Sequence, residues 1–592
     1  MHSKNYIIDI YIEKRGVNSM NDVTALYKEW CEKATDPAIR EELKAIEGKD
    51  DEITDRFWQD LSFGTAGLRG VLGAGTNRMN IYTVRKATEG LCRYLNDDFK
   101  NPSCVIGYDS RINSSLFAKE AACVLAAGGV KVYLFKELIP TPIVAYSVRE
   151  LKCSSGIIIT ASHNPSKYNG YKCYDERGYQ MTDAAADKTL AYINKIDMFS
   201  DVGTVDFDTA VKEGKISYVP DEVIDKFYDL VKSRVINDDV IKNAGLSVIY
   251  TPLNGTGNKP VRRILDMIGI KDVTVVPTQE NPDGNFPTCP FPNPEIREAF
   301  NEALKLAENK KADLLLATDP DCDRVGIAVL DKGEYTLLTG NDVGCLLVDY
   351  ILSQKKAKGT LCEHPIIIKS IVTTDMATRI AESYGAEVIN TLTGFKYMGE
   401  YITMLEEKGE ADRFEMAFEE SYGYLTGPHT RDKDAVNGSM MICEMASYYK
   451  SIGKTLIDAM NDLYKRFGHW KNSLFNFYFE GADGMTKMVG IMDTLRNSTP
   501  DVLGNQPVKT VDDYKLSVSL DKLSGKTTPI TLPKSNVIIM TLDNGDKVVV
   551  RPAGTEPKIK VYIMANGACP RCAEKQTESY KKEILEMLGI GE

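Results

Sequence analysis

One order of secondary structure occurs three times along the chain, and this repetition constrains the fold more than any other feature. Apolar runs that predict strands alternate with stretches of helical periodicity in the order strand, helix, strand, helix, strand. The three copies are predicted over residues 104–159, 246–317 and 365–418. Strands that alternate with helices indicate parallel pairing with right-handed crossovers. The sequence therefore predicts three similar βαβαβ domains.

Each copy ends in a polar loop that directly follows its third strand. The first loop holds Ser162 after the apolar run 156–159, the second spans 319–324 with three aspartates, and the third spans 419–423. Open α/β sheets carry their chemistry at the carboxyl ends of their strands. An ordinary turn explains any one of these loops, because Ser, Asn and Pro favour turns. Three polar loops at equivalent places instead predict one site assembled from three domains.

The segments before and after the repeats have a different character. Residues 21–46 are typical of an amphipathic helical lead-in with Leu26 and Trp30 on one face. We expect the nineteen residues before Met20 to be an upstream extension, because Met20 is a plausible alternative start. After about residue 470, strands at 475–479, 537–542 and 547–550 and a helix at 574–588 predict a smaller α+β piece.

The predicted fold class is therefore α/β, with three similar mixed-sheet domains and a smaller α+β C-terminal domain around a central cleft. The predicted units are an N-terminal helical extension at 1–44, the serine-loop domain at 45–225, the acidic-loop domain at 226–340, the third-loop domain at 341–470 and the C-terminal domain at 471–592.

Net charge and apolar patterning limit the classes of partner. A formal charge of −12 argues against a general nucleic-acid or anionic-membrane partner, which would need a basic surface. No apolar run reaches the length of a membrane span. The segment 6–12 is interrupted by Asp9, which makes it a poor signal peptide. We therefore expect a cytoplasmic protein with a small-molecule partner, and the oligomeric state stays open.

The thirteen cysteines are scattered, which favours reduced thiols over a disulfide framework. Only Cys569 and Cys572 have a motif-like spacing, and no second pair accompanies them as zinc ligands. We expect these two to be incidental thiols near the C-terminal helix. The five histidines lie far apart, and no histidine-based metal site is visible.

Asp319, Asp321 and Asp323 form the candidate metal site. Their hard oxygen ligands suit Mg²⁺ rather than zinc or copper. Three carboxylates so close would raise one another's pKa values unless a cation neutralised them. The alternative is a solvated acidic turn, but the preceding apolar strand puts this loop at a sheet edge.

Three segments have the residue types that hold phosphate. They are the glycine-rich stretch 63–70 with Arg69, residues 551–558 with Arg551, and residues 109–111 ending in Arg111. Glycines admit close backbone approach, and arginine offers a bidentate fork to phosphate oxygens. No Walker pattern is present, which excludes a P-loop NTPase.

Taken together, these motifs resemble the α-D-phosphohexomutases, specifically their longer phosphoglucomutase/phosphomannomutase-type chains. The resemblance covers about residues 45–590. Four motifs occur in the family's order: Thr-Ala-Ser-His-Asn-Pro at 160–165, Asp-Pro-Asp-Cys-Asp-Arg at 319–324, Phe-Glu-Glu-Ser-Tyr-Gly at 418–423 and Arg-Pro-Ala-Gly-Thr-Glu-Pro at 551–557. Two departures are Ala553, where the family often has serine, and Ala66, which replaces a frequent serine in the first glycine loop.

The resemblance implies a phosphoserine enzyme that uses Mg²⁺. The implied assignments are Ser162 as phosphoserine and, through its phosphoryl group, a metal ligand, Asp319, Asp321 and Asp323 as Mg²⁺ ligands, Glu419 and Ser421 as readers of sugar hydroxyls, and Arg551, Gly554 and Thr555 as the grip on the distal phosphate. The implied reaction moves a phosphoryl group between C1 and C6 of a hexose through glucose 1,6-bisphosphate, which also serves as activator.

Several further residues receive expected roles around this centre. We expect Arg69 and Arg324 to face the phosphoryl group, and His163 to orient the loop or donate to phosphate. Lys172 is the candidate general base, made partly neutral by Arg69, and the alternative is a fixed phosphate counter-ion. Second-rank ligands for sugar or phosphate are Gly394, Lys396 and Lys433.

The sugar is the least constrained part of the prediction. We expect glucose phosphates, with phosphopentoses or mannose phosphates as alternatives under the same mechanism. A metal-dependent phosphatase and a non-enzymatic sugar-phosphate sensor are the competing classes. The sensor is disfavoured because Ser162 and all three aspartates are present.

Overall fold

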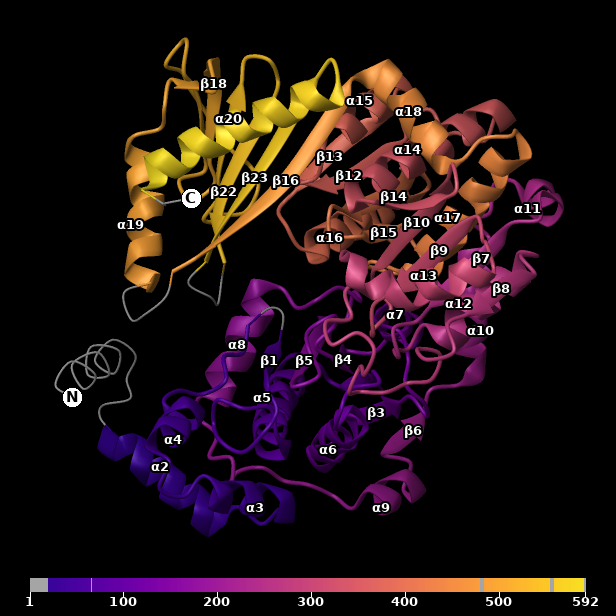
Figure 1. The fold of residues 1–592 in the computed structure, drawn as a ribbon. Coiled ribbons are helices and arrows are strands. Elements are labelled where there is room, and N and C mark those ends of the chain that lie inside the picture. Colours follow the sequence, from indigo (N-terminus) through magenta and orange to yellow (C-terminus); the bar gives the residue numbers. More distant parts are fainter. Residues whose placement is uncertain (1–19, 65–66, 480–483, 554–557, 590–592) are drawn as a thin grey trace.

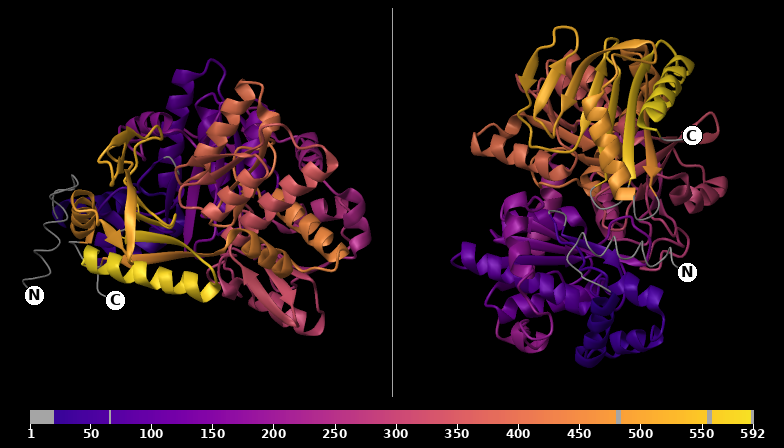
Figure 2. Two further views of the ribbon diagram at one scale, coloured as in Figure 1. Left: turned by 90° about the horizontal axis from the view of Figure 1, so that it is seen from above. Right: turned by 90° about the vertical axis from the view of Figure 1, so that its left-hand side faces the viewer.

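The computed structural model describes residues 20–64, 67–479, 484–553 and 558–589 (Figure 1). The expectations for residues 1–19 and for Ala66, Gly554 and Thr555 lie outside the described residues. In Figure 1 the units follow one another along an arc, from the first at the bottom to the fourth at the upper left. The side view in Figure 2 also puts the first and fourth units at opposite ends.

The first domain carries a mixed sheet with helices on both faces. Its elements are β1 (Leu68–Val71), α5 (Ile81–Asp98), β2 (Ser103–Tyr108), α6 (Ser114–Ala127), β3 (Lys131–Leu134), α7 (Thr141–Glu150), β4 (Ser155–Ile159), β5 (Tyr168–Asp175), α8 (Asp183–Ile193), α9 (Phe207–Lys212) and β6 (Ile216–Tyr218). The strand order is β1-β5-β4-β2-β3-β6. Every residue of β4 is buried, as expected for a strand covered on both faces.

The N-terminal lead-in is three helices rather than one. They are α2 (Met20–Lys33), α3 (Pro37–Ala45) and α4 (Asp50–Phe57). The break follows from Pro37, which cannot continue a helix but can begin one, with Asp36 as its N-cap. Trp30 is buried as predicted and packs edge-to-face on Tyr82 of the first domain.

The second domain repeats the core arrangement. Its elements are α10 (Asp221–Lys232), α11 (Asp238–Ala244), β7 (Ser247–Thr251), α12 (Asn258–Met267), β8 (Asp272–Val275), η1 (Arg297–Phe300), α13 (Asn301–Asn309), β9 (Leu314–Thr318), β10 (Val325–Asp331) and β11 (Glu334–Leu338). The strand order is β11-β10-β9-β7-β8. The helix predicted at 295–307 is a 3₁₀ turn followed by α13.

The third domain has the sheet with the fewest strands, in the order β13-β12-β14-β15. Its elements are α14 (Gly340–Lys358), β12 (Ile366–Ser370), α15 (Asp375–Ser383), β13 (Glu387–Thr391), α16 (Phe395–Glu407), η2 (Ala411–Arg413), β14 (Phe414–Glu419), β15 (Gly423–Leu425), α17 (Ala435–Ser451) and α18 (Leu456–Phe467). A Thr339 capping box starts α14, and Gly359, with φ 67°, ends it.

The same four-strand core occurs in all three sheets. Three strands pair in parallel, and a fourth lies antiparallel beside the last of them: β5 on β4, β10 on β9 and β15 on β14. The predicted threefold order and the mixed sheets are confirmed. The antiparallel strands were not predicted, because each of them follows its neighbour through a short loop and not through a helical crossover.

The fourth domain is an antiparallel sheet covered by helices. Its elements are β16 (His469–Tyr478), α19 (Gly484–Asn497), β17 (Val502–Leu503), β18 (Gln506–Asp513), β19 (Val518–Asp521), β20 (Thr527–Pro529), β21 (Ile538–Leu542), β22 (Lys547–Pro552), β23 (Lys558–Gly567) and α20 (Pro570–Leu588). The main strand order is β16-β23-β22-β21-β18-β19-β20. A shared apolar cluster joins it to the third domain, with Val372 and Leu392 packed against Val549 and Tyr562.

Cys569 and Cys572 form a disulfide, so the expectation of two reduced thiols is wrong for this pair. The remaining cysteines are free, as expected. Among the described helices, none is long and apolar enough to cross a membrane.

Candidate active site

The three polar loops leave equivalent strands, β4, β9 and β14, and each contains one strained residue. Ser162, Cys322 and Tyr422 have φ values of 52°, 54° and 65°. Non-glycine residues seldom adopt this left-handed conformation, and they persist in it where the surrounding structure requires it. A residue in the left-handed conformation therefore follows the third strand of the repeat in all three domains.

Ser162 is buried and lies between its own domain and the second. Its Oγ donates to Asp319 Oδ2 at 2.8 Å and lies 3.2 Å from His163 Nδ1. Its backbone N–H donates to Thr160 Oγ1 at 2.8 Å. The hydroxyl that the sequence singled out thus touches the acidic loop, 157 residues further along the chain.

Arg111 supports the backbone of the serine loop. Its guanidinium is fully buried and donates to the carbonyl oxygens of Ser162, Asn164, Pro165 and Tyr168. The expectation that residues 109–111 hold phosphate is therefore wrong for Arg111, since backbone carbonyls already occupy both of its terminal nitrogens. Arg111 fixes the shape of the loop.

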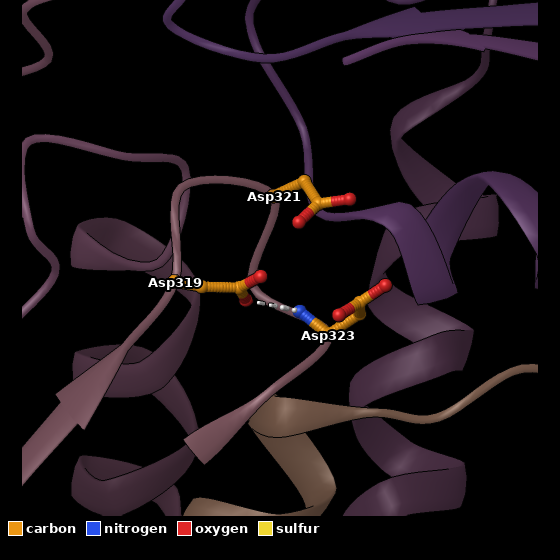
Figure 3. A group of neighbouring side chains, drawn as sticks. All are labelled: Asp319, Asp321 and Asp323. Carbon is orange, nitrogen blue, oxygen red and sulfur yellow. Dashed lines mark hydrogen bonds between the residues drawn. The ribbon is translucent and has the colours of Figure 1, made fainter. Parts of the chain in front are cut away.

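Asp319, Asp321 and Asp323 converge as predicted (Figure 3). All three are buried, and they offer oxygen atoms that lie within 4.8 Å of one another. The backbone N–H groups of Asp323 and Arg324 donate to Asp319 Oδ1 at 3.1 and 3.0 Å.

Two oxygens of this triad lack a partner. Asp321 Oδ1 and Asp323 Oδ1 are buried without a hydrogen bond among the described residues. A buried carboxylate oxygen left unpaired is costly, and a hard divalent cation would satisfy it. The donor set therefore fits Mg²⁺.

The pKa values of Asp319 and Asp321 are shifted in opposite directions. Burial and the neighbouring Asp321 and Asp323 raise the pKa of Asp319 well above its usual range. Burial acts in the same sense on Asp321, but the charge of Lys172 outweighs it and holds that pKa well below its usual range.

Lys172 lies on β5, the antiparallel strand that follows the serine loop. Its Nζ donates to Asp321 Oδ2 at 2.8 Å and to Asp323 Oδ2 at 3.4 Å. Burial alone would lower its pKa, but these two carboxylates outweigh burial and raise it. The expectation that Arg69 makes Lys172 partly neutral is therefore wrong, because the aspartates are its immediate neighbours. This ion pairing favours the counter-ion alternative.

Two arginines flank the triad. Arg324 Nη1 pairs with Glu295 Oε1 at 2.5 Å, and its Nε lies 3.9 Å from Asp323 Oδ1. Arg69 on β1 is solvent-exposed, and its charge interacts with Asp321, Arg324 and Asp323. Both predicted arginines therefore lie at this site.

His163 is the next residue of the serine loop, and its Nδ1 lies 3.2 Å from Ser162 Oγ. Burial, with Arg324 and Arg69 nearby, holds its pKa well below the usual range, so the ring is neutral at neutral pH. The ring meets Phe291 edge-to-face, with centroids 5.7 Å apart. A neutral imidazole fixed in this way can orient the serine hydroxyl.

The third loop brings Glu419 to Gly394. Glu419 Oε1 accepts the Gly394 N–H at 2.9 Å, and Gly394, with φ 120°, is the N-cap of α16. Ser421 is half-buried on the same loop. Lys433 reaches the acidic loop instead, with Nζ 2.8 Å from Asp323 Oδ2. Lys396 pairs with Asp183 of the first domain at 2.9 Å.

The fourth domain contributes a group of cations. Arg551 at the end of β22 lies opposite Lys560 on β23. Burial and the charges of Arg551 and Lys558 lower the pKa of Lys560, while Glu420 and Glu295 act in the opposite sense. Like-charged side chains gathered in this way provide an attractive environment for an anion.

Sequence reasoning missed four contributors to the site: Thr141, whose Oγ1 donates to Asp321 Oδ2 at 2.8 Å, Glu295, Lys560, and Arg111 in its scaffold role. Glu295 and Thr141 follow prolines at the start of helical segments and carry no other local signal. Lys560 could have been found, because it lies just beyond the 551–558 segment.

Comparison with known proteins places these features in a family. The three phosphoglucomutase/phosphomannomutase α/β/α domain models match residues 60–199, 225–333 and 339–467. A phosphoglucomutase from Staphylococcus aureus is 36% identical over 548 residues, covering 91% of this chain and 95% of the relative. One from Staphylococcus saprophyticus is 37% identical over 504 residues, covering 85% and 90%.

Solved structures agree at the level of the fold. A phosphoglucomutase/phosphomannomutase family protein from Burkholderia thailandensis superposes with a TM-score of 0.65 at 17% identity, covering 89% of this chain and 98% of its own. The open form of parafusin, a phosphoglucomutase from Paramecium, gives a TM-score of 0.64 at 16% identity, covering 90% and 96%.

Proposed function

We propose that this chain, which belongs to the phosphoglucomutase/phosphomannomutase family, interconverts α-D-glucose 1-phosphate and glucose 6-phosphate. The observation that carries the proposal is the 2.8 Å hydrogen bond from Ser162 Oγ to Asp319 Oδ2. It brings a candidate nucleophile against a buried triad of hard oxygen ligands. Glucose is the sugar of choice because the Staphylococcus relatives are named phosphoglucomutases.

Asp319, Asp321 and Asp323 would hold Mg²⁺, with the phosphoryl group of Ser162 as a further ligand. The ion would supply charge stabilisation for a transferring phosphoryl group. Thr141 and the amides of Asp323 and Arg324 orient the carboxylates for this role.

Ser162 would carry the transferred group. In the forward direction the phosphorus–Oγ bond breaks and a phosphorus–oxygen bond forms to the free sugar hydroxyl, which loses its proton. The product is a glucose 1,6-bisphosphate, which turns within the site and returns its other phosphoryl group to Ser162. The same bisphosphate would act as activator by loading an unphosphorylated Ser162.

Lys172 we assign as a charged partner of the transferring group rather than the base. Its two carboxylate neighbours favour the protonated form. Arg69 and Arg324 would add charge from the first and second domains, and neutral His163 would orient the serine side chain.

The third and fourth domains would bind the rest of the substrate. Glu419 and Ser421 would form hydrogen bonds with sugar hydroxyls, with Gly394, Lys396 and Lys433 as second-rank ligands. Arg551, with Gly554 and Thr555, would hold the phosphate that does not react, and we add Lys560 to this group.

The test of substrate compares kcat/KM for the 1-phosphates of glucose, mannose, ribose and deoxyribose, each with catalytic glucose 1,6-bisphosphate. Loss of a hydrogen-bonded hydroxyl can cost about 10⁴-fold in such a ratio. We expect glucose to be preferred. If a pentose or mannose phosphate wins by tenfold or more, the sugar assignment is wrong while the mutase reaction stands.

Product analysis tests the reaction class. We expect glucose 6-phosphate without stoichiometric inorganic phosphate. Phosphate release from glucose 1-phosphate without glucose 6-phosphate would instead identify a phosphatase. Phosphoryl transfer of neither kind would favour a sensor.

A further inference from the structure

Cys569 and Cys572 form a site that has no part in the proposed mutase reaction. They flank Pro570-Arg571 at the beginning of α20, and their sulfur atoms are bonded to each other. The other cysteines are free, and all except Cys31 and Cys362 are buried. Within the part of the chain that the structure describes, this is the only bonded pair of cysteines, and the exposure of Cys572 lets other molecules reach it.

The two sulfur atoms have different surroundings. Cys572 is solvent-exposed, whereas Cys569 is half-buried. Cys569 is the N-cap of α20, a helix of 19 residues, and its Sγ accepts the Cys572 N–H at 3.1 Å. Free amides and the dipole at a helix N-terminus stabilise a thiolate there. Cys569 is thus the better leaving group, and Cys572 is the sulfur that an incoming thiol can attack.

A purely structural role accounts poorly for this bond. A disulfide constrains the unfolded chain more as the loop it closes lengthens, and this loop has a sequence separation of only 3. The helix is already held by buried Tyr580, Ile584 and Leu588, which belong to the apolar core of the fourth domain. The fold of α20 does not depend on a bond within its first turn.

We propose that Cys569-Pro570-Arg571-Cys572 is a thiol–disulfide exchange site whose substrate is a low-molecular-weight thiol and its disulfide. An incoming thiolate forms a bond to Cys572 Sγ, the Cys569–Cys572 bond breaks, and the electron pair leaves on Cys569. A second thiolate then attacks the sulfur of the first thiol, and Cys572 leaves as a thiolate. In sum, the protein disulfide and two thiols give the protein dithiol and one external disulfide, and protons taken up balance the charges.

Arg571 supports this assignment of substrate. Its side chain lies between the two cysteines in sequence and is solvent-exposed. An exposed cation on the residue next to Cys572 favours approach of an anionic thiolate. The site therefore suits a small acidic thiol, for which glutathione is the probe.

The first experiment equilibrates the full-length folded protein in buffers of defined reduced and oxidised glutathione, followed by acid quenching and maleimide labelling. We expect the two thiols to appear together. The ratio of protein dithiol to protein disulfide should be proportional to the square of the reduced glutathione concentration divided by the oxidised glutathione concentration. Cys362→Ser, which removes a half-buried free thiol, is the matched control and should leave the transition unchanged. A pair that resists glutathione throughout, or reacts only after unfolding, would overturn the proposal.

The second experiment tests which sulfur is the leaving group. Iodoacetamide alkylation is followed against pH in Cys572→Ser, which leaves Cys569, and in Cys569→Ser, which leaves Cys572. We expect the pH midpoint of the Cys569 alkylation rate to lie at least about one pH unit below that of Cys572. The ordinary pKa of a cysteine thiol is about 8.5. Equal or reversed midpoints would refute the assigned direction of attack. Both readouts are independent of mutase turnover, so the exchange proposal can fail while the proposed mutase reaction holds, and the reverse.

Discussion

The serine and acidic loops are bonded to each other across a domain boundary, whereas Arg551 and Lys560 of the fourth domain make no such bond among the described residues. Ser162 and Lys172 of the first domain bond to Asp319 and Asp321 of the second, both at 2.8 Å. Among the described residues, no hydrogen bond or ion pair links the side chains of Arg551 or Lys560 to the first three domains. The part of the site that we propose performs chemistry is thus preassembled, and the part that we propose recognises the distal phosphate is not.

This difference follows from the charges present. The chemical half contains carboxylates, lysines and a hydroxyl that pair with one another, so it can form before substrate binds. The fourth-domain group holds cations that repel one another, and burial together with the charges of Arg551 and Lys558 lowers the pKa of Lys560. Only an added anion can draw them together, and the distal phosphate of a sugar bisphosphate would be such an anion.

Removal of the nucleophile should give the largest effect. Ser162→Ala should lower turnover by about 10⁴-fold or more, because side chains that act as one catalytic unit fail together. The thermal midpoint should change little, since the serine loop is also held by Arg111. Steady-state kinetics and thermal unfolding of the same preparation provide the measurement. Turnover within tenfold of the parent would show that Ser162 is not the phosphoryl carrier.

The acidic loop comes next in expected effect. Asp321→Asn should lower turnover on the order of 10²-fold and raise the Mg²⁺ concentration needed for half activity, because a bound metal's charge stabilisation is worth several kcal/mol. Exhaustive chelation of the parent should stop turnover, and Mg²⁺ should restore it. Asp331→Asn, at the far end of β10 in the same domain, is the control. Full activity after chelation would make the triad a structural feature.

The sequence predicted the chemical half better than its supports. The apolar runs before Ser162 and Asp319 predicted that both residues lie at sheet edges. Because the two loops follow equivalent strands of their domains, the sequence also predicted that they meet in one site. What it could not supply was the pairing of Lys172, which depends on a carboxylate 149 residues away. A lysine expected to lose its proton beside an arginine instead lies against two aspartates, and its pKa moves the other way.

Arg111 gives the same lesson for the loop's scaffold. An arginine beside an aspartate and a serine resembles a phosphate holder in sequence, and only the fold reveals the carbonyl oxygens that surround it. The antiparallel strands escaped detection for a related reason, because their position is set by pairing with a neighbour rather than by a pattern of their own. Long-range contacts thus decided the points on which local patterns failed.

Lys172 tests whether charge or proton transfer matters in the preassembled half. Its raised pKa keeps it protonated from pH 6 to 9, so the ion pair persists below the unfolded value of about 10.4 and weakens only as the pH rises through the higher folded value. Lys172→Arg should therefore keep turnover within about tenfold, and Lys172→Met should lose far more and unfold at lower temperature, since breaking a buried pair costs about 3–5 kcal/mol.

The pH–rate profiles separate the two roles. A counter-ion predicts the same basic limb in the parent and in Lys172→Arg. A general base predicts that Lys172→Arg is as inactive as Lys172→Met, because arginine stays protonated throughout this range. The second result would contradict the assignment of Lys172 as a charged partner.

The smallest effect is expected in the half that is not preassembled. Lys560→Gln should raise KM by about threefold to tenfold and leave kcat within about twofold, because a partly exposed cation–phosphate contact contributes about 1 kcal/mol and holds a group that does not react. Lys509→Gln, an exposed lysine on β18 of the same sheet, should change neither constant. Because the parent cations repel one another, the variant should also unfold at an unchanged or slightly higher temperature without substrate. A fall in kcat with KM unchanged would place Lys560 in the chemical half and break the division between the two regions.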